Sequence, residues 1–257
     1  MSNEGPDFLG IGVARSGTTT AYKVLKRHPD IFMPETKELH FFTSSNQANT
    51  ESPDNITTIE EEYRNRFSPK GSRIGGEISP SYFYFPGTAE KIHAFNPDIK
   101  LFCILRNPVD RALSDFHYSG LNKDMSSIDF FMQGIRELQD NSVTRTPFSP
   151  STIIFKGLYS YHITIYANQF PDNQLLFLPF DLLKNDAEQF FQHLFSFLGV
   201  QENIEDVIAS ENAASYPEKT DDSQARELLE KVYHKELMFF EEFKNNWRET
   251  YHLARNF

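Results

Sequence analysis

The sequence predicts an α/β fold built around a central parallel sheet. Four short apolar runs, typical of buried parallel strands, occur along the chain, and segments with helical patterns separate them. Because strands and helices alternate along the chain, the strands are expected to run parallel. The predicted strands are FLGIGV at 8–13, RIGGEI at 73–78, KLFCIL at 100–105 and QLLFLP at 174–179.

The segments between these runs carry signals for the start and the end of helices. A glycine-rich turn precedes the first predicted helix, and Pro108 opens the helix that follows the third predicted strand. Gly199 follows an amphipathic segment, at a position where helices commonly end. The predicted helices are Thr18–His28, one beginning at Pro108, Ile163–Phe170, Asp186–Leu198 and one from Asp221 or Asp222 through Phe243.

No internal repeat, low-complexity tract or linker divides the chain, so a single domain over residues 1–257 is expected. Two polar stretches, Thr43–Thr58 and Asn141–Ser151, are predicted to be mobile loops on the substrate side. Loops of this kind often carry the residues that select a substrate.

Composition narrows the function classes. The formal net charge is −11, which disfavours nucleic-acid binding and a long polyanionic acceptor. The single cysteine, Cys103, lies in an apolar run and is predicted to be a buried structural thiol, so neither a disulfide within the chain nor a zinc cluster is expected. The N-terminus lacks a secretory signal, and no apolar run approaches the roughly 20 residues of a membrane span. A cytoplasmic protein is therefore expected.

The segment GVARSGTTT, Gly12 to Thr20, predicts an anion site between a strand and a helix. Unpaired N–H groups in the first helical turn and the helix dipole attract a negative charge there. Gly17 allows close approach, the threonines add hydroxyls, and Arg15 adds a planar cation. An ordinary strand-to-helix turn capped by Ser or Thr is the alternative. A P-loop NTPase is disfavoured, because Thr18 stands where the P-loop lysine would be.

A second group of residues follows the third predicted strand, in LRNPVDRALSDFHY. Arg106 lies at the carboxyl end of that strand, where open α/β sheets bind ligands, and it replaces the Mg²⁺-binding Asp of an NTPase. Ser114 lies eight residues later on the next predicted helix. A second phosphate held by Arg106 and Ser114 would explain both residues. Arg111 fits a solvated surface and a structural salt bridge equally well.

Taken in order, these segments resemble the sulfotransferases that use 3′-phosphoadenosine-5′-phosphosulfate (PAPS). The pair ARSGTTT and LRNPVDRALSDFHY carries the resemblance, and HPDIFMPETKELHFF, GEISPSYF and SYPEKTDD extend it over about residues 7 to 245. The chain looks most like the heparan-sulfate-type and bacterial branch. This resemblance implies a P-loop-NTPase-like three-layer sandwich, with helices on both faces of the parallel sheet.

The resemblance also implies site residues. It places the 5′-phosphosulfate on the first loop and the 3′-phosphate on Arg106 and Ser114, with Tyr159, Tyr216 and Lys219 near the adenosine and no metal. The loop residues are Arg15, Ser16, Gly17, Thr18, Thr19 and Thr20. The base that removes the proton from the substrate hydroxyl is Glu38 or His40 of KELHFF, with Glu38 favoured. These residues alternate along the chain, so on an extended segment their side chains would point the same way.

The chain departs from the family pattern at several positions. Arg15 stands where the family usually has Lys, and Thr19 replaces an Arg of the heparan-sulfate enzymes. Ile78 stands where those enzymes have a catalytic-site Lys, and Thr43 where some have an Asp. These changes are compatible with PAPS binding but speak against a heparan-type acceptor.

The predicted function is transfer of a sulfuryl group from PAPS to the hydroxyl of a small molecule or carbohydrate, which releases 3′-phosphoadenosine-5′-phosphate (PAP). A metal-independent nucleotide phosphotransferase and a non-catalytic PAP-binding module are the alternatives. The sequence identifies neither the acceptor nor the oligomeric state.

Overall fold

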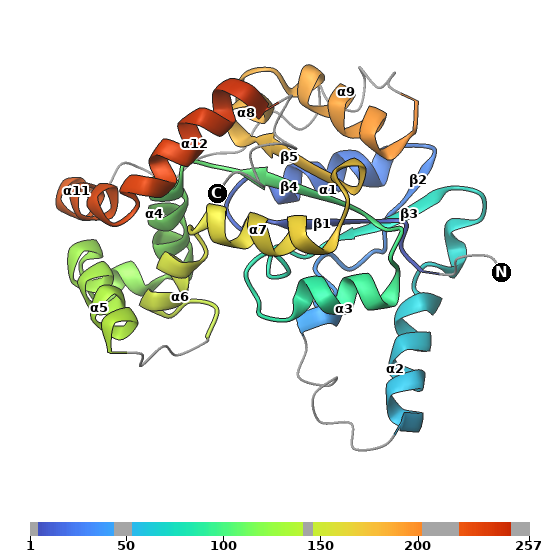
Figure 1. Cartoon of the computed structure of the whole chain (residues 1–257), viewed down its shortest axis with the longest axis horizontal. Helices are drawn as coiled ribbons and strands as arrows, with labels where there is room; N and C mark the ends of the chain where they lie inside the picture. Colours follow the sequence, from blue (N-terminus) through green and yellow to red (C-terminus); the bar gives the residue numbers. More distant parts are fainter. Residues whose placement is uncertain (1–4, 44–52, 141–145, 202–220, 248–257) are drawn as a thin grey trace. The chain divides into compact units, whose positions relative to one another are not determined.

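The computed structural model describes residues 5–43, 53–140, 146–201 and 221–247 (Figure 1). Contacts between residues divide the chain into two compact units. Unit 1 comprises Met1–Val13, Gly17–Leu105 and Tyr166–Ala214, and unit 2 comprises Ala14–Ser16, Arg106–Ile165 and Ser215–Phe257. Each unit is described by itself.

Unit 1 contains a five-stranded, fully parallel sheet in the order β2-β3-β1-β4-β5. The predicted parallel sheet is therefore confirmed, and all four predicted strands are present. The additional strand, β2, has two residues, too few for a pattern to reveal. The strands are β1 (Phe8–Gly12), β2 (Ile31–Phe32), β3 (Ile74–Ile78), β4 (Lys100–Leu105) and β5 (Leu175–Pro179).

Central strand β1 pairs with β3 on one side and with β4 on the other, so Phe8 lies opposite both Gly76 and Lys100. The four longer strands are almost entirely buried, as expected for a parallel sheet covered on both faces. Cys103 on β4 is buried, and burial raises the pKa of its thiol well above the usual value, which confirms the predicted structural role.

Helices flank the sheet (Figure 1). The helix α1 ends before the predicted His28, whose side chain accepts from the Asp30 N–H. As predicted, α9 ends at Gly199, which has φ 81°. The predicted loop Thr43–Thr58 is wrong in its last part, where a helix begins at Pro53; residues 44–52 lie outside the described residues. The helices are α1 (Thr18–Arg27), α2 (Pro53–Asn65), α3 (Thr88–Phe95), α8 (Phe180–Asn185) and α9 (Ala187–Leu198).

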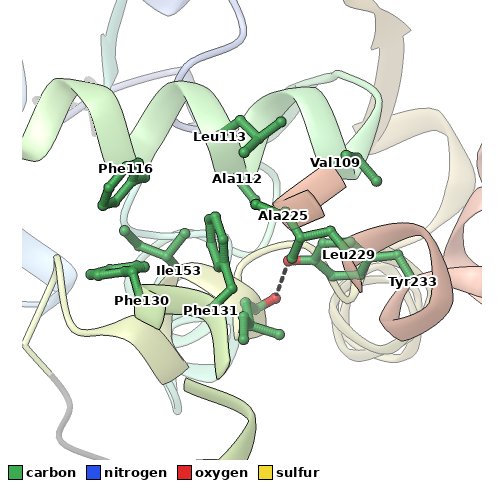
Figure 2. Close-up of a cluster of buried hydrophobic side chains, with 11 residues drawn as sticks. Val109, Ala112, Leu113, Phe116, Phe130, Phe131, Ile153, Ala225, Leu229 and Tyr233 are labelled. Atoms are coloured by element: carbon green, nitrogen blue, oxygen red, sulfur yellow. Dashed lines mark hydrogen bonds between the residues drawn. The ribbon is translucent and has the colours of Figure 1, made fainter. Parts of the chain in front are cut away.

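Unit 2 is helical, and its helices share one apolar core (Figure 2). Residues from α4 face residues from α5, α6 and α11, which confirms the predicted apolar side of α4 with Ala112, Leu113 and Phe116. This core holds the helix that carries Ser114. The helices are α4 (Pro108–Ser119), α5 (Ser127–Gln139), α6 (Pro150–Phe155), α11 (Ser223–Val232) and α12 (His234–Asn246).

The single C-terminal helix predicted through Phe243 is wrong, because two helices meet at Tyr233. Tyr233 is fully buried, and its hydroxyl donates to the Ile154 carbonyl oxygen at 2.7 Å (Figure 2). The Gly157 position leaves room for this ring, because a Cβ there would lie 2.6 Å from the Tyr233 hydroxyl. The break between the two helices therefore coincides with the long-range packing of Tyr233, which the helical pattern of the sequence does not show.

Helix α7 (Tyr159–Gln169) starts four residues before the predicted Ile163. Its first turn is tied to α12, since the Ser160 N–H and hydroxyl both donate to the buried carboxylate of Glu236. Part of the loop predicted at Asn141–Ser151 is also helical, because α6 begins at Pro150; residues 141–145 lie outside the described residues.

Short 3₁₀ segments connect several of these elements. They are Phe41–Thr43, Ser68–Lys70, Leu121–Lys123 and Asp172–Gln174. None of the helices in the described ranges is long and apolar enough to cross a membrane.

His162 makes the stability of unit 2 dependent on pH. Its ring is 1% exposed, and burial lowers the pKa of His162 from 6.5 to about 4, although the hydrogen bond to the Phe155 carbonyl oxygen (3.0 Å) opposes the shift. As the pH falls, His162 is therefore protonated in the unfolded chain before it is protonated in the folded protein. Stability is fully present above the unfolded pKa of about 6.5 and is lost as the pH falls from there towards about 4.

We expect the free energy of unfolding to fall between pH 7 and pH 5 by about 2 kcal/mol more than in His162→Gln. The glutamine keeps a donor for the Phe155 carbonyl oxygen but does not titrate. Urea unfolding of both proteins at the two pH values measures the difference. Parallel pH dependence in the two proteins would show that His162 binds its proton equally well in the native and unfolded states.

Candidate functional site

The predicted site residues lie in two groups. Unit 2 contains Arg15, Ser16, Arg106, Ser114 and Tyr159, and unit 1 contains residues 17–20 together with Glu38 and His40. Tyr216 and Lys219 lie outside the described residues. We refer to the residues of unit 2 as the cation group and to Glu38 with His40 as the carboxylate–imidazole pair.

In the cation group, tertiary structure brings together residues that are far apart in the sequence. Arg15 Nε donates to Ser114 Oγ at 3.2 Å, across a separation of 99 residues. Arg106 Nη1 donates to the Arg15 carbonyl oxygen at 2.8 Å. The two arginines predicted to bind separate phosphates are therefore linked through the backbone of the loop itself. Two guanidinium groups and a hydroxyl form a compact donor set of the kind that binds phosphate or sulfate oxygens.

Tyr118 is a member of this group that the sequence did not reveal. The Arg15 guanidinium carbon lies 4.1 Å from the centre of the Tyr118 ring, in a cation–π arrangement. Tyr118 is 65% exposed, and it stands four residues after Ser114 on the same helix. The i, i+4 spacing to a predicted phosphate ligand was the available signal, because such residues share a helix face.

Tyr159 is a buried member of the cation group that contacts the backbone of Arg106. It is fully buried, and its hydroxyl donates to the Arg106 carbonyl oxygen at 2.7 Å. Asn107 caps the following helix, since its Oδ1 accepts from the N–H groups of Val109 and Asp110. These bonds fix the backbone that directly follows the Arg106 side chain. Direct contact of Tyr159 with a nucleotide stays a prediction.

Helix α1 begins with donor groups that its own side chains do not satisfy. Gly17 is the N-cap residue, at φ 81°, and no side chain caps the helix there. A Cβ at Gly17 would lie 2.6 Å from Leu183 Cδ2, so both the backbone angle and the space require glycine. Among the first-turn threonines, Thr18 is buried, Thr20 is partly exposed and Thr19 is exposed.

The Ser16 hydroxyl is fully buried, and within the described part of the chain it has no hydrogen-bond partner. A buried hydroxyl without a partner is costly unless a ligand or water satisfies it. This buried donor fits an oxyanion such as a phosphate or sulfate group.

Glu38 and His40 contact each other, and the backbone around them differs from the predicted extended segment. His40 Nε2 lies 3.5 Å from Glu38 Oε2, and Lys37 Nζ donates to the other oxygen of Glu38. The segment is not extended: Glu38 has φ 63° and His40 has φ 53°, both in the left-handed region. The side chains therefore meet through two left-handed residues, and the predicted alternation of an extended segment is wrong.

Electrostatics keep Glu38 ionised. The hydrogen bond from His40 lowers the pKa of Glu38 from 4.5 to about 2, with a further contribution from Lys37, although burial opposes the shift. On the far side of the imidazole, His40 Nδ1 lies 2.8 Å from Ser81 Oγ, so both ring nitrogens have polar neighbours. No pattern along the chain indicates Ser81 in this role.

Arg15, Glu38 and His40 share one further property. They are the non-glycine residues with positive φ in the described part of the chain, and they are also the three predicted catalytic residues. A left-handed conformation at a residue with a Cβ costs about 1–3 kcal/mol and persists only where the surroundings enforce it. Such strain gathers at functional sites, so it supports these three positions independently of the motifs.

The structure shows the partners of two further side chains of α4. His117 Nε2 lies 2.7 Å from Asp222 Oδ2, beside the start of α11. For Arg111, a solvated surface and a structural salt bridge were the two alternatives. The residue is fully buried and pairs with Asp115 at 3.2 Å, so the salt bridge is correct. Within the described ranges, no three His, Cys, Asp or Glu side chains are grouped so as to hold a metal ion.

Comparison with known proteins identifies one family. The model of the sulfotransferase domain family matches residues 5–252. Human heparan sulfate glucosamine 3-O-sulfotransferase 6 is 29% identical over 207 residues, which are 78% of this chain and 54% of the human protein. The chain thus spans about half the length of the curated relatives it matches. A membrane-associated sulfotransferase of Dictyostelium discoideum is 33% identical over 114 residues, 44% of this chain and 23% of that protein.

Solved structures agree with this assignment. The crystal structure of a sulfotransferase from Alicyclobacillus acidocaldarius has a TM-score of 0.72 and 26% sequence identity, and the match covers 95% of this chain and 98% of that chain. The sulfotransferase domain from the curacin biosynthetic pathway, at 14% identity and a TM-score of 0.58, shares the fold; its match covers 86% of this chain and 82% of that domain. The resemblance to the heparan-sulfate-type and bacterial branch is confirmed.

Proposed function

Because the chain belongs to the sulfotransferase domain family, we propose that it transfers a sulfuryl group from PAPS to an acceptor hydroxyl and releases PAP. The observation that carries this proposal is the link between Arg15, Ser114 and Arg106, since it joins the two predicted phosphate positions through side chains of unit 2. The buried Ser16 hydroxyl adds a donor that needs an acceptor oxygen.

In the transfer, PAPS supplies the sulfuryl group, and the bond between sulfur and the bridging oxygen of the 5′-phosphate breaks. The electron pair stays on that oxygen, so negative charge grows on the phosphate as the acceptor oxygen bonds to sulfur. Arg15 stabilises this charge. Arg106 and Ser114 bind the 3′-phosphate, and Tyr159 holds the Arg106 backbone in place.

The proton of the substrate hydroxyl goes to the carboxylate–imidazole pair. Glu38 is ionised at neutral pH and can take the proton, but a carboxylate whose pKa is lowered to about 2 is a weak base by itself. His40 contacts the same carboxylate, so the proton is shared by the pair rather than held by one residue. Glu38 remains the favoured first acceptor; once the proton passes on to His40, the positive charge of the imidazolium is balanced by the Glu38 carboxylate.

The acceptor class follows from charge. The net charge of −11 repels a polyanion, and the heparan-type lysine position is occupied by Ile78, which is buried. We therefore propose an uncharged hydroxyl compound, either a small alcohol or phenol or a neutral carbohydrate. The cytoplasmic location and the single domain expected from the sequence stay predictions.

Ligand binding and turnover test the proposal together. PAP is expected to raise the melting temperature of the protein without a metal, and Arg106→Ala should weaken PAP about 10-fold or more but hardly affect adenosine 5′-phosphosulfate, which lacks the 3′-phosphate. Calorimetric titration of both ligands into both proteins measures this. Equal losses for the two ligands would contradict the placement of the 3′-phosphate on Arg106.

The alternatives give different results. Stabilisation by Mg-ATP with no response to PAP would indicate a phosphotransferase and overturn the proposal. PAP binding without conversion of PAPS, tested with a panel of aliphatic alcohols, phenols, neutral sugars and heparan sulfate, would indicate a binding module. Turnover with heparan sulfate alone would contradict the proposed acceptor class.

A further inference from the structure

We propose that Glu77 is a positioning residue for the transfer: its buried carboxylate holds the backbone segment that carries Glu38 and His40. The role in transfer rests on the proposed function. The contacts that support the structural part of the role all lie within unit 1.

Four donors converge on the Glu77 carboxylate, which is 1% exposed. The hydroxyls of Tyr63 and Tyr82 donate to Oε1 at 2.8 and 2.6 Å. The Ser79 hydroxyl and the Leu39 N–H donate to Oε2 at 2.7 and 3.1 Å. A buried carboxylate with this many donors is strongly anchored, because it cannot give up a partner without leaving a polar atom unsatisfied.

The two oxygens have different neighbours. Oε1 is held by the tyrosines, whose pKa values burial raises well above the usual range, so both phenols keep their protons and donate. Oε2 faces the segment after Lys37. It binds the Leu39 N–H directly and binds His40 indirectly, since the His40 N–H donates to Ser79 Oγ at 3.1 Å. Two successive peptide groups of this segment therefore depend on Oε2.

These two peptide groups lie where the backbone needs support. Leu39 separates Glu38 and His40, both of which have left-handed backbone angles. Such angles persist in residues with a Cβ only when surrounding contacts enforce them. Glu77 stands on β3, paired with β1 opposite Leu9, and is therefore fixed to the sheet. The sheet thus sets the position of the carboxylate–imidazole pair through a single carboxylate.

Glu77 acts through other residues rather than on a substrate, because its side chain is enclosed. The sequence nevertheless offered a signal: a glutamate near the end of an otherwise apolar strand, in GEISPSY, must be partnered if that strand is buried. Its four donors come from α2, from the turn after β3 and from the segment that it holds.

Two variants that each remove one bond to Glu77 test the role. Ser79→Ala removes the bond to Oε2 and the acceptor of the His40 N–H, whereas Tyr63→Phe removes one bond to Oε1 and keeps the ring. In the absence of nucleotide, amide hydrogen exchange at Leu39 and His40 is expected to rise about 10-fold in Ser79→Ala and to change little in Tyr63→Phe. Exchange at Leu9 of β1 serves as the internal control.

The kinetic consequence separates positioning from general stability. With PAPS and the acceptor that the panel identifies, kcat of Ser79→Ala should fall about 100-fold, while PAP affinity stays within about 2-fold of wild type. Tyr63→Phe should retain kcat. Glu77→Gln should repeat the Ser79→Ala pattern if it folds, because an amide offers only one accepting oxygen to four donors.

Several results would overturn the role. Unchanged exchange at Leu39 and His40 in Ser79→Ala would show that Oε2 does not hold the segment. Equal changes in Tyr63→Phe would indicate general loosening of the packing. Faster exchange with unchanged kcat would separate the segment from the transfer. If the wild-type protein converts no PAPS, the proposed function fails, and the exchange data alone still decide whether Glu77 holds the segment.

Discussion

Arg15→Ala is expected to lower the turnover of PAPS about 100- to 1,000-fold, the usual loss when one donor to a developing oxyanion is removed. Arg15 contributes its charge, its bond to Ser114 and its stacking on Tyr118, so alanine removes all three. The loss should appear mainly in kcat, because Arg106 and Ser114 still bind the 3′-phosphate. Steady-state release of PAP with the acceptor from the panel measures it.

Arg15→Lys is the matched control. Lysine restores the positive charge, but it has neither the planar fork nor the Nε that reaches Ser114. We expect lysine to recover most of the lost activity, to within about 10-fold of wild type. Wild-type turnover in the alanine variant would remove Arg15 from the catalytic residues, and failure of lysine to recover activity would show that the shape of the guanidinium is essential.

Asp115→Asn is expected to destabilise the protein by about 3–5 kcal/mol, because it leaves two buried cations without their anion. Asp115 Oδ2 lies 3.2 Å from Arg111 Nη1 and 2.9 Å from Lys156 Nζ, and all three side chains are buried. Arg111 also donates to the Ile153 carbonyl oxygen, which ties the triad to the core of unit 2. Burial already lowers the pKa of Lys156, with Asp115 opposing, so the anion is needed to keep that charge.

The control lies on the same helix. Asp110 pairs with Arg226 at 2.7 Å, but both side chains are more than 40% exposed. Asp110→Asn should therefore cost at most about 1 kcal/mol. Urea unfolding of the two variants and wild type gives the comparison. Similar small losses would mean that water or a relaxed backbone compensates the buried cations, and the triad would then be unimportant for stability.

The parts of the fold that the sequence predicted correctly are those determined by residues close together along the chain. Apolar runs of strand length and a glycine stop signal at Gly199 led to four strands and to the bounds of α9 within one residue. The misses have non-local causes. Tyr233 separates α11 from α12 where it reaches across to Ile154, and β2 is two residues that pair only because β3 is beside them.

The same division holds for the site. The sequence by itself determined which candidate groups are present: the Arg15 loop, the Arg106 and Ser114 spacing, and the Glu38 and His40 pair. Residue type and order along the chain are enough to predict a phosphate site and a base. Only the tertiary structure decided how these groups are held. It placed Arg15 on Ser114 and Tyr118, joined Glu38 to His40 through left-handed backbone, and brought Glu77 to the Leu39 N–H between Glu38 and His40. The contacts of Arg15 and of Glu77 join residues tens of positions apart, and no local pattern encodes which distant partner satisfies a buried polar group.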